Sequence, residues 1–237
     1  SCVLVSSVLF GTGLIVPELQ QIAAACTRHG AEMMVDAYHS LGVVPFSLDG
    51  MEQAFVLGGG YKYMQLGEGN CFMRVPEGCE MRPVITGWFS EFAELADAKT
   101  EGEVRYGKGF MRFSGSTFDP TSQYRGAAVL DFFAEQGLST ELLRSVSQHQ
   151  VGLLVETLES LDLDPAMVSI DAGVPLESRA GFLTVRAPDA EALSVALREH
   201  GVSTDARGDR LRFGPAPYLS DAQVVQAMET LREVVPR

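Results

Sequence analysis

Residues 3–36 have the pattern of a strand, a helix and a second strand, and this order restricts the fold more than any other feature. Val3–Val8 is rich in valine and leucine, as strands buried on both faces are. A helix is expected to begin at Pro17 and to end at Gly30, before the buried strand Glu32–Val35. Strands joined by one helix in this way run parallel, in a sheet with covered faces. The pattern therefore predicts an α/β fold.

The following segments extend the predicted sheet and then become helical. Gly42–Phe46 is expected to form a turn and a short extended piece, and strands are expected at Ala54–Leu57 and Cys71–Arg74. Helices are expected from Thr121 to Ala134 and from Thr140 to Leu161. The second helix carries an apolar stripe formed by Leu142, Val146, Leu153, Leu154 and Leu158.

The last part of the chain has a different order of elements. The pattern predicts a strand, a helix, two strands and a helix, at Ala180–Arg186, Pro188–His200, Val202–Asp205, Arg210–Phe213 and Ser220–Val235. This order is typical of a small α+β domain with helices on one face of the sheet.

The chain is acidic, because 31 aspartates and glutamates stand against 18 lysines and arginines, a net charge of −13. Nucleic acids and anionic membranes bind basic surfaces, so we expect neither as a partner. The longest apolar runs are too short to span a bilayer, and no secretory leader precedes them, although the chain begins with Ser1. The four cysteines lack CxxC spacing, so we expect reduced thiols in a cytoplasmic protein.

Lysine is scarce, with only Lys62, Lys99 and Lys108 against fifteen arginines. Lys62 lies between two tyrosines, directly after a glycine-rich strand end. One interpretation is a surface lysine whose aliphatic stem covers apolar neighbours. The other is a Schiff-base lysine, whose amine loses water and so acquires a lower pKa that lets it attack a carbonyl.

Two further polar residues follow a predicted strand end, where open α/β sheets bind ligands. Asp36 comes directly after the buried strand that ends at Val35, and a carboxylate there needs a cationic partner. A protonated pyridine nitrogen is such a partner, whereas the alternative is a turn or helix-cap aspartate. His39 is expected near the same ring in a supporting role, or as a structural histidine.

Seven segments follow one another in an order that suggests a known family: Val35–His39, Gly42–Pro45, Gly60–Tyr63, Gly67–Gly69, Arg82–Pro83, Gly87–Phe89 and Arg210–Tyr218. Together they resemble pyridoxal-phosphate (PLP) enzymes of the class V aminotransferase group, which have fold type I, and within that group kynureninase. The resemblance extends from about Val3 to Val234. It implies that residues 1–118 form the C-terminal part of a large PLP-binding domain, and residues 119–237 the linking helices and a small C-terminal domain.

The resemblance also implies roles for particular residues around the cofactor. Lys62 would bind PLP covalently and later move a proton, Asp36 would pair with the pyridinium nitrogen, and Tyr61 would donate a hydrogen bond to the phosphate. Arg212 would hold the α-carboxylate of the substrate with its two-pronged guanidinium. The alternative for Arg212 is an ion pair at a strand edge.

Two segments are implied to reach a neighbouring subunit. Trp88, and Ser116 and Thr117 in the Gly115–Thr117 turn, would approach the partner's phosphate and substrate in a homodimer. The alternatives are a core position for Trp88 and a helix cap for the turn. The family also carries a phosphate-binding turn and a ring-stacking aromatic before the first strand, so an amino-terminal segment or a partner chain is expected to supply these.

The function implied is that of a PLP-dependent hydrolase of the kynureninase type, in tryptophan catabolism. It would cleave the Cβ–Cγ bond of L-kynurenine or a related amino acid to give alanine and an aromatic acid. The alternatives are a class V aminotransferase, another PLP-dependent lyase, or a non-catalytic subunit that retains the fold. A cysteine desulfurase is disfavoured, because the last cysteine, Cys79, follows Lys62 too closely.

Overall fold

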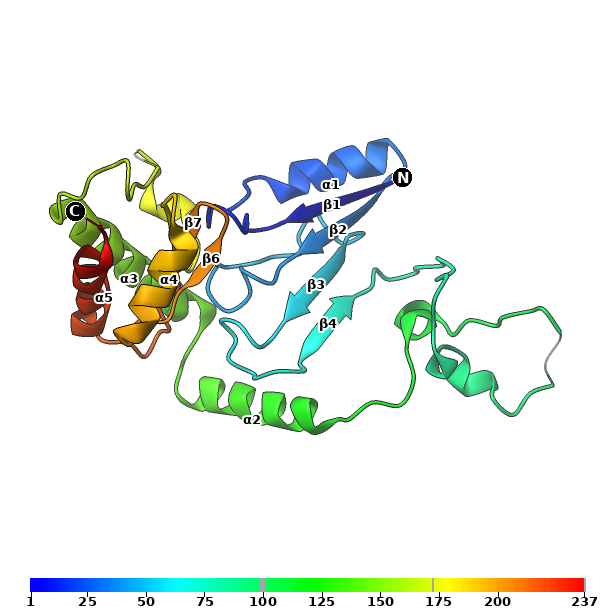
Figure 1. Cartoon of the computed structure of the whole chain (residues 1–237). Helices are drawn as coiled ribbons and strands as arrows, with labels where there is room; N and C mark the ends of the chain where they lie inside the picture. Colours follow the sequence, from blue (N-terminus) through cyan, green and yellow to red (C-terminus); the bar gives the residue numbers. More distant parts are fainter. Residues whose placement is uncertain (99–100, 172, 237) are drawn as a thin grey trace.

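The computed structural model describes residues 1–98, 101–171 and 173–236 (Figure 1). The elements in chain order are β1 (Cys2–Ser6), α1 (Leu19–Arg28), β2 (Glu32–Asp36), β3 (Phe55–Gly59), β4 (Cys71–Arg74), the 3₁₀ segments η1 (Trp88–Glu94) and η2 (Gly109–Phe113), α2 (Thr121–Glu135), α3 (Thr140–Ser160), η3 (Leu176–Ser178), β5 (Leu183–Arg186), α4 (Ala190–Glu199), β6 (Asp205–Arg207), β7 (Arg210–Phe213) and α5 (Asp221–Val234).

The first sheet has the order β1-β2-β3-β4. β1, β2 and β3 are parallel, whereas β4 runs antiparallel to β3. The apolar side of α1 packs against this sheet, with Ala23 and Cys26 in one cluster with Met33, Val35 and Val56. The predicted α/β fold with a mostly parallel sheet is confirmed.

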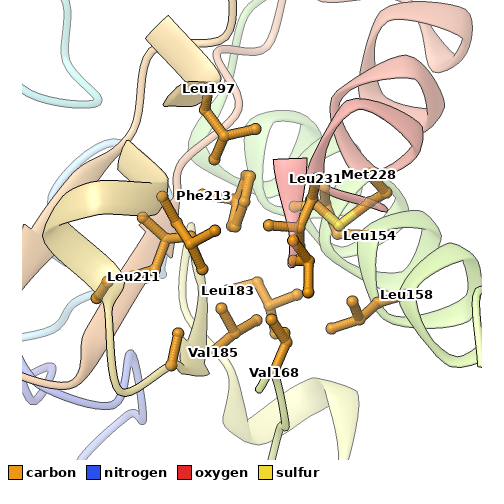
Figure 2. Packing of buried hydrophobic residues seen from close by; sticks show 14 of the residues in the cluster. Leu154, Leu158, Val168, Leu183, Val185, Leu197, Leu211, Phe213, Met228 and Leu231 are labelled. Atoms are coloured by element: carbon orange, nitrogen blue, oxygen red, sulfur yellow. The ribbon is translucent and has the colours of Figure 1, made fainter. Parts of the chain in front are cut away.

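The second sheet has the order β5-β7-β6 and is antiparallel throughout. Its apolar side chains share one core with α3, α4 and α5 (Figure 2). The centre of this core is fully buried and consists of Leu183, Leu197, Leu211, Met228 and Leu231. Burial of such side chains is the main favourable term in folding. The predicted small C-terminal α+β domain is confirmed, whereas the boundary at residue 118 stays a prediction.

Several element boundaries differ from the expectation. β5 begins at Leu183 rather than Ala180, because the Ala180 N–H donates to the Gly13 carbonyl of the first part of the chain (2.8 Å). β6 covers Asp205–Arg207 instead of Val202–Asp205, since the Val202 N–H still donates to a carbonyl in the last turn of α4.

The Gly42–Phe46 segment contains the predicted turn, in which the N–H groups of Val43 and Val44 both donate to the Ser40 carbonyl, and it forms no strand. The predicted apolar stripe of the second helix is wrong at its start. In α3, Leu142 is exposed and Leu143 is buried, so the start of the apolar stripe is rotated by one residue. Leu154 and Leu158, farther along the same stripe, are buried as predicted.

The arrangement of the two sheets positions the site. β1, β2 and β3 point their carboxyl ends toward the second sheet (Figure 1). Val8, Val44 and Phe182 belong to a small apolar cluster that joins the two parts. The segment that contains η1 and η2 extends from the opposite end of the first sheet (Figure 1). Within the described ranges, no helix is long and apolar enough to cross a membrane.

Candidate active site

An open cleft of about 660 Å³ is lined by residues from both parts of the chain. Four predicted site residues line it: His39, Tyr61, Lys62 and Arg212. The first three come from the segments that follow β2 and β3, which is where the parallel sheet was expected to bind a ligand. Arg212 comes from β7. The fold therefore brings together residues that are far apart in the sequence.

Lys62 lies in a tight loop after β3. The Leu66 N–H donates to the Gly60 carbonyl (2.8 Å), and a Cβ atom on Gly60 would lie 2.6 Å from the Leu66 side chain, so glycine is required there. Burial lowers the pKa of Lys62, and the nearby Arg212 lowers it further. A lysine with a lowered pKa has more of the neutral, nucleophilic amine at neutral pH.

Of the other two lysines, Lys108 can be compared with Lys62 in the structure. Lys108 is absent from the cleft lining, and Lys99 lies outside the described residues. None of the four cysteines lines the cleft, and all four belong to the described ranges.

Asp36 ends β2 and is half-buried. Its Oδ1 accepts a hydrogen bond from the Tyr38 N–H (3.0 Å), which is the turn role considered as its alternative. Asp36 is not part of the cleft wall, but its charge acts on both His39 and Lys62 and raises their pKa values against the larger effect of burial. The hydrogen bond from Tyr38 uses only Oδ1 of the carboxylate. Asp36 therefore combines a local contact with an electrostatic effect on the cleft.

His39 and Tyr61 supply aromatic surface to the cleft. The His39 ring lies between Phe10 and Phe182, with ring centroids 5.6 Å away on each side. Burial, with Lys62 and Arg212 nearby, lowers the pKa of His39 to about 4, so the ring is neutral at neutral pH. The Tyr61 ring is exposed and lies 5.4 Å from the Lys62 Nζ atom.

Arg212 is held from several sides. Its Cζ atom lies 3.7 Å from the centroid of the Phe10 ring, and its Nη1 donates to the Phe10 carbonyl (3.2 Å). Its Nη2 forms an ion pair with Asp205 on β6. The alternative for Arg212 was an ion pair at a strand edge; the ion pair exists, but β7 is the middle strand of its sheet, and Arg212 lines the cleft as well.

Phe10 and Asp205 were not predicted as site residues. Asp205 lies directly opposite Arg212 in the β6–β7 pairing, so a correctly placed hairpin would have identified it. No sequence signal points to Phe10, because its contact with Arg212 joins residues at opposite ends of the chain.

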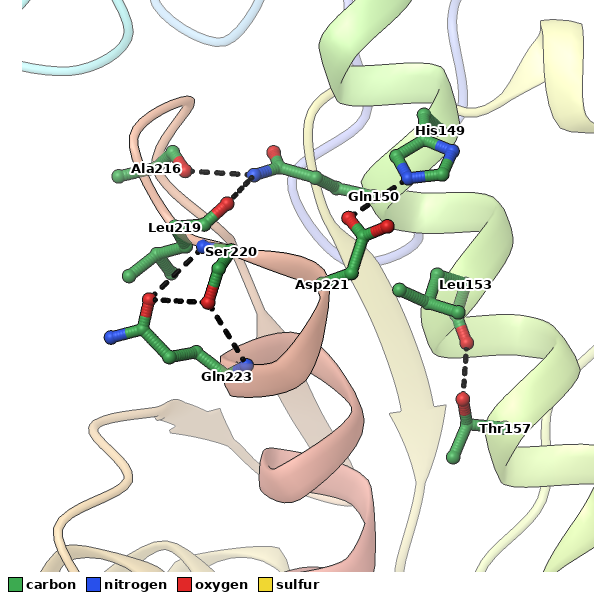
Figure 3. Close-up of polar contacts among 9 residues, drawn as sticks. All are labelled: His149, Gln150, Leu153, Thr157, Ala216, Leu219, Ser220, Asp221 and Gln223. Atoms are coloured by element: carbon green, nitrogen blue, oxygen red, sulfur yellow. Dashed lines mark hydrogen bonds and ion pairs between the residues drawn. The ribbon is translucent and has the colours of Figure 1, made fainter.

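The turn at residues 214–218 completes the cleft wall, and polar contacts fix it (Figure 3). The buried Gln150 side chain of α3 donates to the carbonyls of Ala216 (3.0 Å) and Leu219 (3.2 Å). α5 then begins with a capping box, in which Ser220 and Gln223 exchange side chain-to-backbone hydrogen bonds. The turn is therefore tied to two helices of the second domain.

Trp88, Ser116 and Thr117 lie outside the cleft. The Phe89 N–H donates to the Gly115 carbonyl (3.0 Å), which brings the Gly115–Thr117 turn beside Trp88. The Trp88 side chain is 47% exposed, which disfavours a core role. The structure thus groups these three residues with one another and separately from Lys62.

Comparison with known proteins shows which family the chain resembles. Residues 143–231 match the family model of the kynureninase C-terminal domain. Nearly the whole chain is also similar to curated kynureninases, at 28% identity to that of Pseudomonas fluorescens and 28% to that of Deinococcus radiodurans, over 99% and 98% of the chain. The chain is kynureninase-like. It spans 56% of the length of each of these two relatives.

Solved structures show the fold of the kynureninase-like chain. A cysteine desulfurase from Thermococcus onnurineus superposes with a TM-score of 0.79 at 17% identity, over 99% of this chain and 60% of that one. A cystine C-S lyase gives 0.78 at 22% identity, over 99% and 61%. A serine palmitoyltransferase from S. paucimobilis with bound PLP gives 0.62 at 15% identity, over 98% and 54%. The predicted fold type I of PLP enzymes is confirmed.

Proposed function

We propose that this chain belongs to a PLP-dependent hydrolase of the kynureninase type, which cleaves the Cβ–Cγ bond of L-kynurenine or a related amino acid. The products are alanine and an aromatic acid. One observation carries the proposal: an amine of lowered pKa on Lys62 and the guanidinium of Arg212 line one cleft. The similarity to kynureninases along nearly the whole chain supports it.

The residues of the cleft fit PLP. The aldehyde of PLP needs an amine, which Lys62 offers, and its pyridine nitrogen needs an anion, for which Asp36 stands at the end of β2. The neutral His39 ring suits a place near an aromatic cofactor, and the exposed Tyr61 hydroxyl suits a phosphate. Bound PLP would supply an electron-withdrawing ring that stabilises negative charge on the α-carbon of the substrate.

The side chains of this chain then have separate tasks. Arg212 binds the α-carboxylate and orients the amino acid toward Lys62. The Lys62 amine accepts the proton from the α-carbon, and the Asp36 carboxylate keeps a proton on the pyridine nitrogen. A water oxygen adds to the γ-carbonyl, the Cβ–Cγ bond breaks, and Cβ takes up a proton to give alanine.

A homodimer completes the proposal. The segment that carries Trp88 exposes Val84 and Ile85 almost fully, at 98% and 90%, and Phe110 at 67%. Val84 and Ile85 are adjacent in sequence, and exposed apolar side chains that lie together are typical of interaction surfaces. In the proposed dimer, Trp88, Ser116 and Thr117 contribute to the site of the neighbouring subunit. The cytoplasmic location of the protein stays a prediction.

The test combines cofactor attachment with turnover. The protein is supplied with PLP, reduced with borohydride and weighed intact, and Lys62→Ala is treated in parallel. We expect a covalent adduct on the wild type alone, and release of an aromatic acid from L-kynurenine without any added keto acid. An adduct that persists in Lys62→Ala contradicts the assignment of Lys62, and turnover that requires a keto acid indicates an aminotransferase instead.

A further inference from the structure

We propose that Asp205 is a positioning residue for Arg212, which it orients so that the guanidinium can receive the carboxylate of a ligand. This inference rests on the proposed function, in which Arg212 binds the α-carboxylate. Asp205 itself lines the same cleft.

The geometry of the hairpin places the two side chains together. Asp205 on β6 and Arg212 on β7 are directly paired in the antiparallel register, and Asp205 Oδ2 forms the ion pair with Arg212 Nη2. Asp205 Oδ1 is bound in turn by Arg207 Nη1 at 3.0 Å. The carboxylate is therefore held by a cation on each side, and its orientation toward Arg212 is restricted.

The ion pair with Asp205 uses only part of the N–H donors of Arg212. A guanidinium has five N–H groups. One on Nη2 goes to Asp205 and one on Nη1 goes to the Phe10 carbonyl. Nε is buried and has no hydrogen-bond partner among the described residues. One N–H therefore remains on each terminal nitrogen as a donor for the carboxylate of a ligand.

The burial of the Arg212 charge also indicates that Arg212 needs Asp205 as a counterion. The Arg212 side chain is only 11% exposed, and a buried cation without a counterion is strongly unfavourable. The Phe10 carbonyl and ring contribute partial charges only, whereas Asp205 contributes a full negative charge. Without Asp205, Arg212 is expected to turn toward solvent and away from the Phe10 ring.

The chain provides a matched control. Asp209 lies in the same hairpin and forms an ion pair with Arg210 at 3.4 Å, but it does not line the cleft. Removal of Asp209 is expected to abolish one ion pair of the hairpin without affecting Arg212.

The experiment measures dissociation constants by calorimetry on the PLP-supplied protein, for an L-kynurenine analogue that lacks the γ-carbonyl oxygen and so is not cleaved, and for the decarboxylated amine of that analogue. We expect Asp205→Ala to raise the constant for the amino acid about tenfold or more and to leave that for the amine unchanged. Asp205→Asn, which keeps an oxygen acceptor, is expected to lie between, and Asp209→Ala is expected to match the wild type. Circular dichroism tests whether each variant is folded. If Asp205→Ala does not fold, the dissociation constants of Asp205→Asn test the positioning role instead.

The outcomes separate the two proposals. If the wild type prefers the amino acid and Arg212→Lys removes that preference, but neither Asp205 variant changes it, the positioning role is wrong and the proposed function stands. Equal losses for both ligands, or equal effects of the Asp205 and Asp209 variants, also overturn the positioning role. A wild type that binds both ligands equally contradicts the proposed function itself.

Discussion

Lys62 and Arg212 each have a lowered pKa because they are partly removed from water, and the charge of Arg212 lowers the pKa of Lys62 further. Two cations in one cleft attract an anionic ligand, and Asp36 and Glu68 compensate only part of that charge at Lys62. At the scale of single residues, the cleft is therefore suited to a ligand that combines a carboxylate with a group able to react with an amine.

Arg212→Lys is expected to reduce kcat/KM for amino-acid substrates even though the charge is kept. An ammonium cannot form the two-pronged contact, so the loss is about 1.5–3 kcal/mol, roughly tenfold to over a hundredfold. A decarboxylated amine analogue should bind with unchanged affinity. Arg210→Lys is the control, because Arg210 pairs with Asp209 and lies outside the cleft wall. Equal losses in both variants would assign Arg212 a purely structural role.

His39→Phe is expected to flatten the dependence of stability on pH. The pKa of His39 falls from 6.5 in the unfolded chain to about 4 in the folded one. Between these values only the unfolded chain binds the proton, so the free energy of unfolding decreases as the pH falls from 6.5 toward 4. Phenylalanine keeps the ring contacts with Phe10 and Phe182 and removes the titration.

Urea unfolding of the wild type and of His39→Phe at a series of pH values measures the effect. Because His39 is partly exposed, we expect the decrease in the free energy of unfolding between pH 6.5 and 4 to be smaller in His39→Phe than in the wild type by about 1–2 kcal/mol. His29→Phe, on an exposed side chain after α1, serves as the control. Parallel curves for wild type and His39→Phe would contradict this role of His39.

Among the strands and helices, segments with a strong apolar periodicity were predicted at the correct positions, whereas segments with a weak periodicity were not. Arg210–Phe213 was identified as a strand because its alternating apolar pattern matches the burial it has in the fold. Val3–Val8 contains the predicted strand β1, but the prediction that this strand is buried on both faces is wrong, because β1 is an edge strand on which Val3 and Leu4 are exposed. β6 was placed too early, since Val202 is an apolar residue that closes α4 instead of starting a strand. That shift left Asp205 at the end of the predicted strand and concealed its pairing with Arg212.

Leu211→Ala is expected to destabilise the second domain strongly. Leu211 lies in the middle of β7, is fully buried and belongs to the core that α3, α4 and α5 share. Its truncation removes apolar contacts and leaves a cavity, which costs about 2–5 kcal/mol. The free energy of unfolding in urea measures this, and Leu142→Ala, at an exposed position of α3, should change it by less than about 0.5 kcal/mol. Similar values for both variants would place Leu211 outside the core.

At the scale of the whole molecule, the residue-level predictions fall into two spatial groups. Lys62, Tyr61, His39 and Arg212 meet in the cleft, as the parallel-sheet argument and the resemblance led us to expect. The group around Trp88 lies in the segment that extends from the far end of the first sheet. The sequence of one chain contains no pattern that shows where such a segment contacts a neighbouring subunit. The role of Trp88, Ser116 and Thr117 in the partner's site therefore stays a prediction.

Mixed dimers test that role. If each site combines Lys62 of one subunit with Trp88 of the other, co-expression of Lys62→Ala and Trp88→Ala should restore activity. Half of the dimers are then hybrids with one intact site, so about one quarter of the wild-type activity is expected. Each variant alone should be nearly inactive. Activity in the mixture that equals the mean of the two separate variants would place both residues in the same subunit's site, or Trp88 in none.

The two walls of the cleft belong to different sheets, and this affects which ligands fit. The spacing between the Lys62 amine and the Arg212 guanidinium depends on how Val8, Val44 and Phe182 pack between the sheets, and on the Phe10 carbonyl that receives Arg212. Preference for ligand length thus depends in part on Val8 and Val44, which do not line the cleft. Changes in their volume would widen or narrow the cleft as a unit, so relatives could acquire new substrates through packing alone, with every reactive side chain retained.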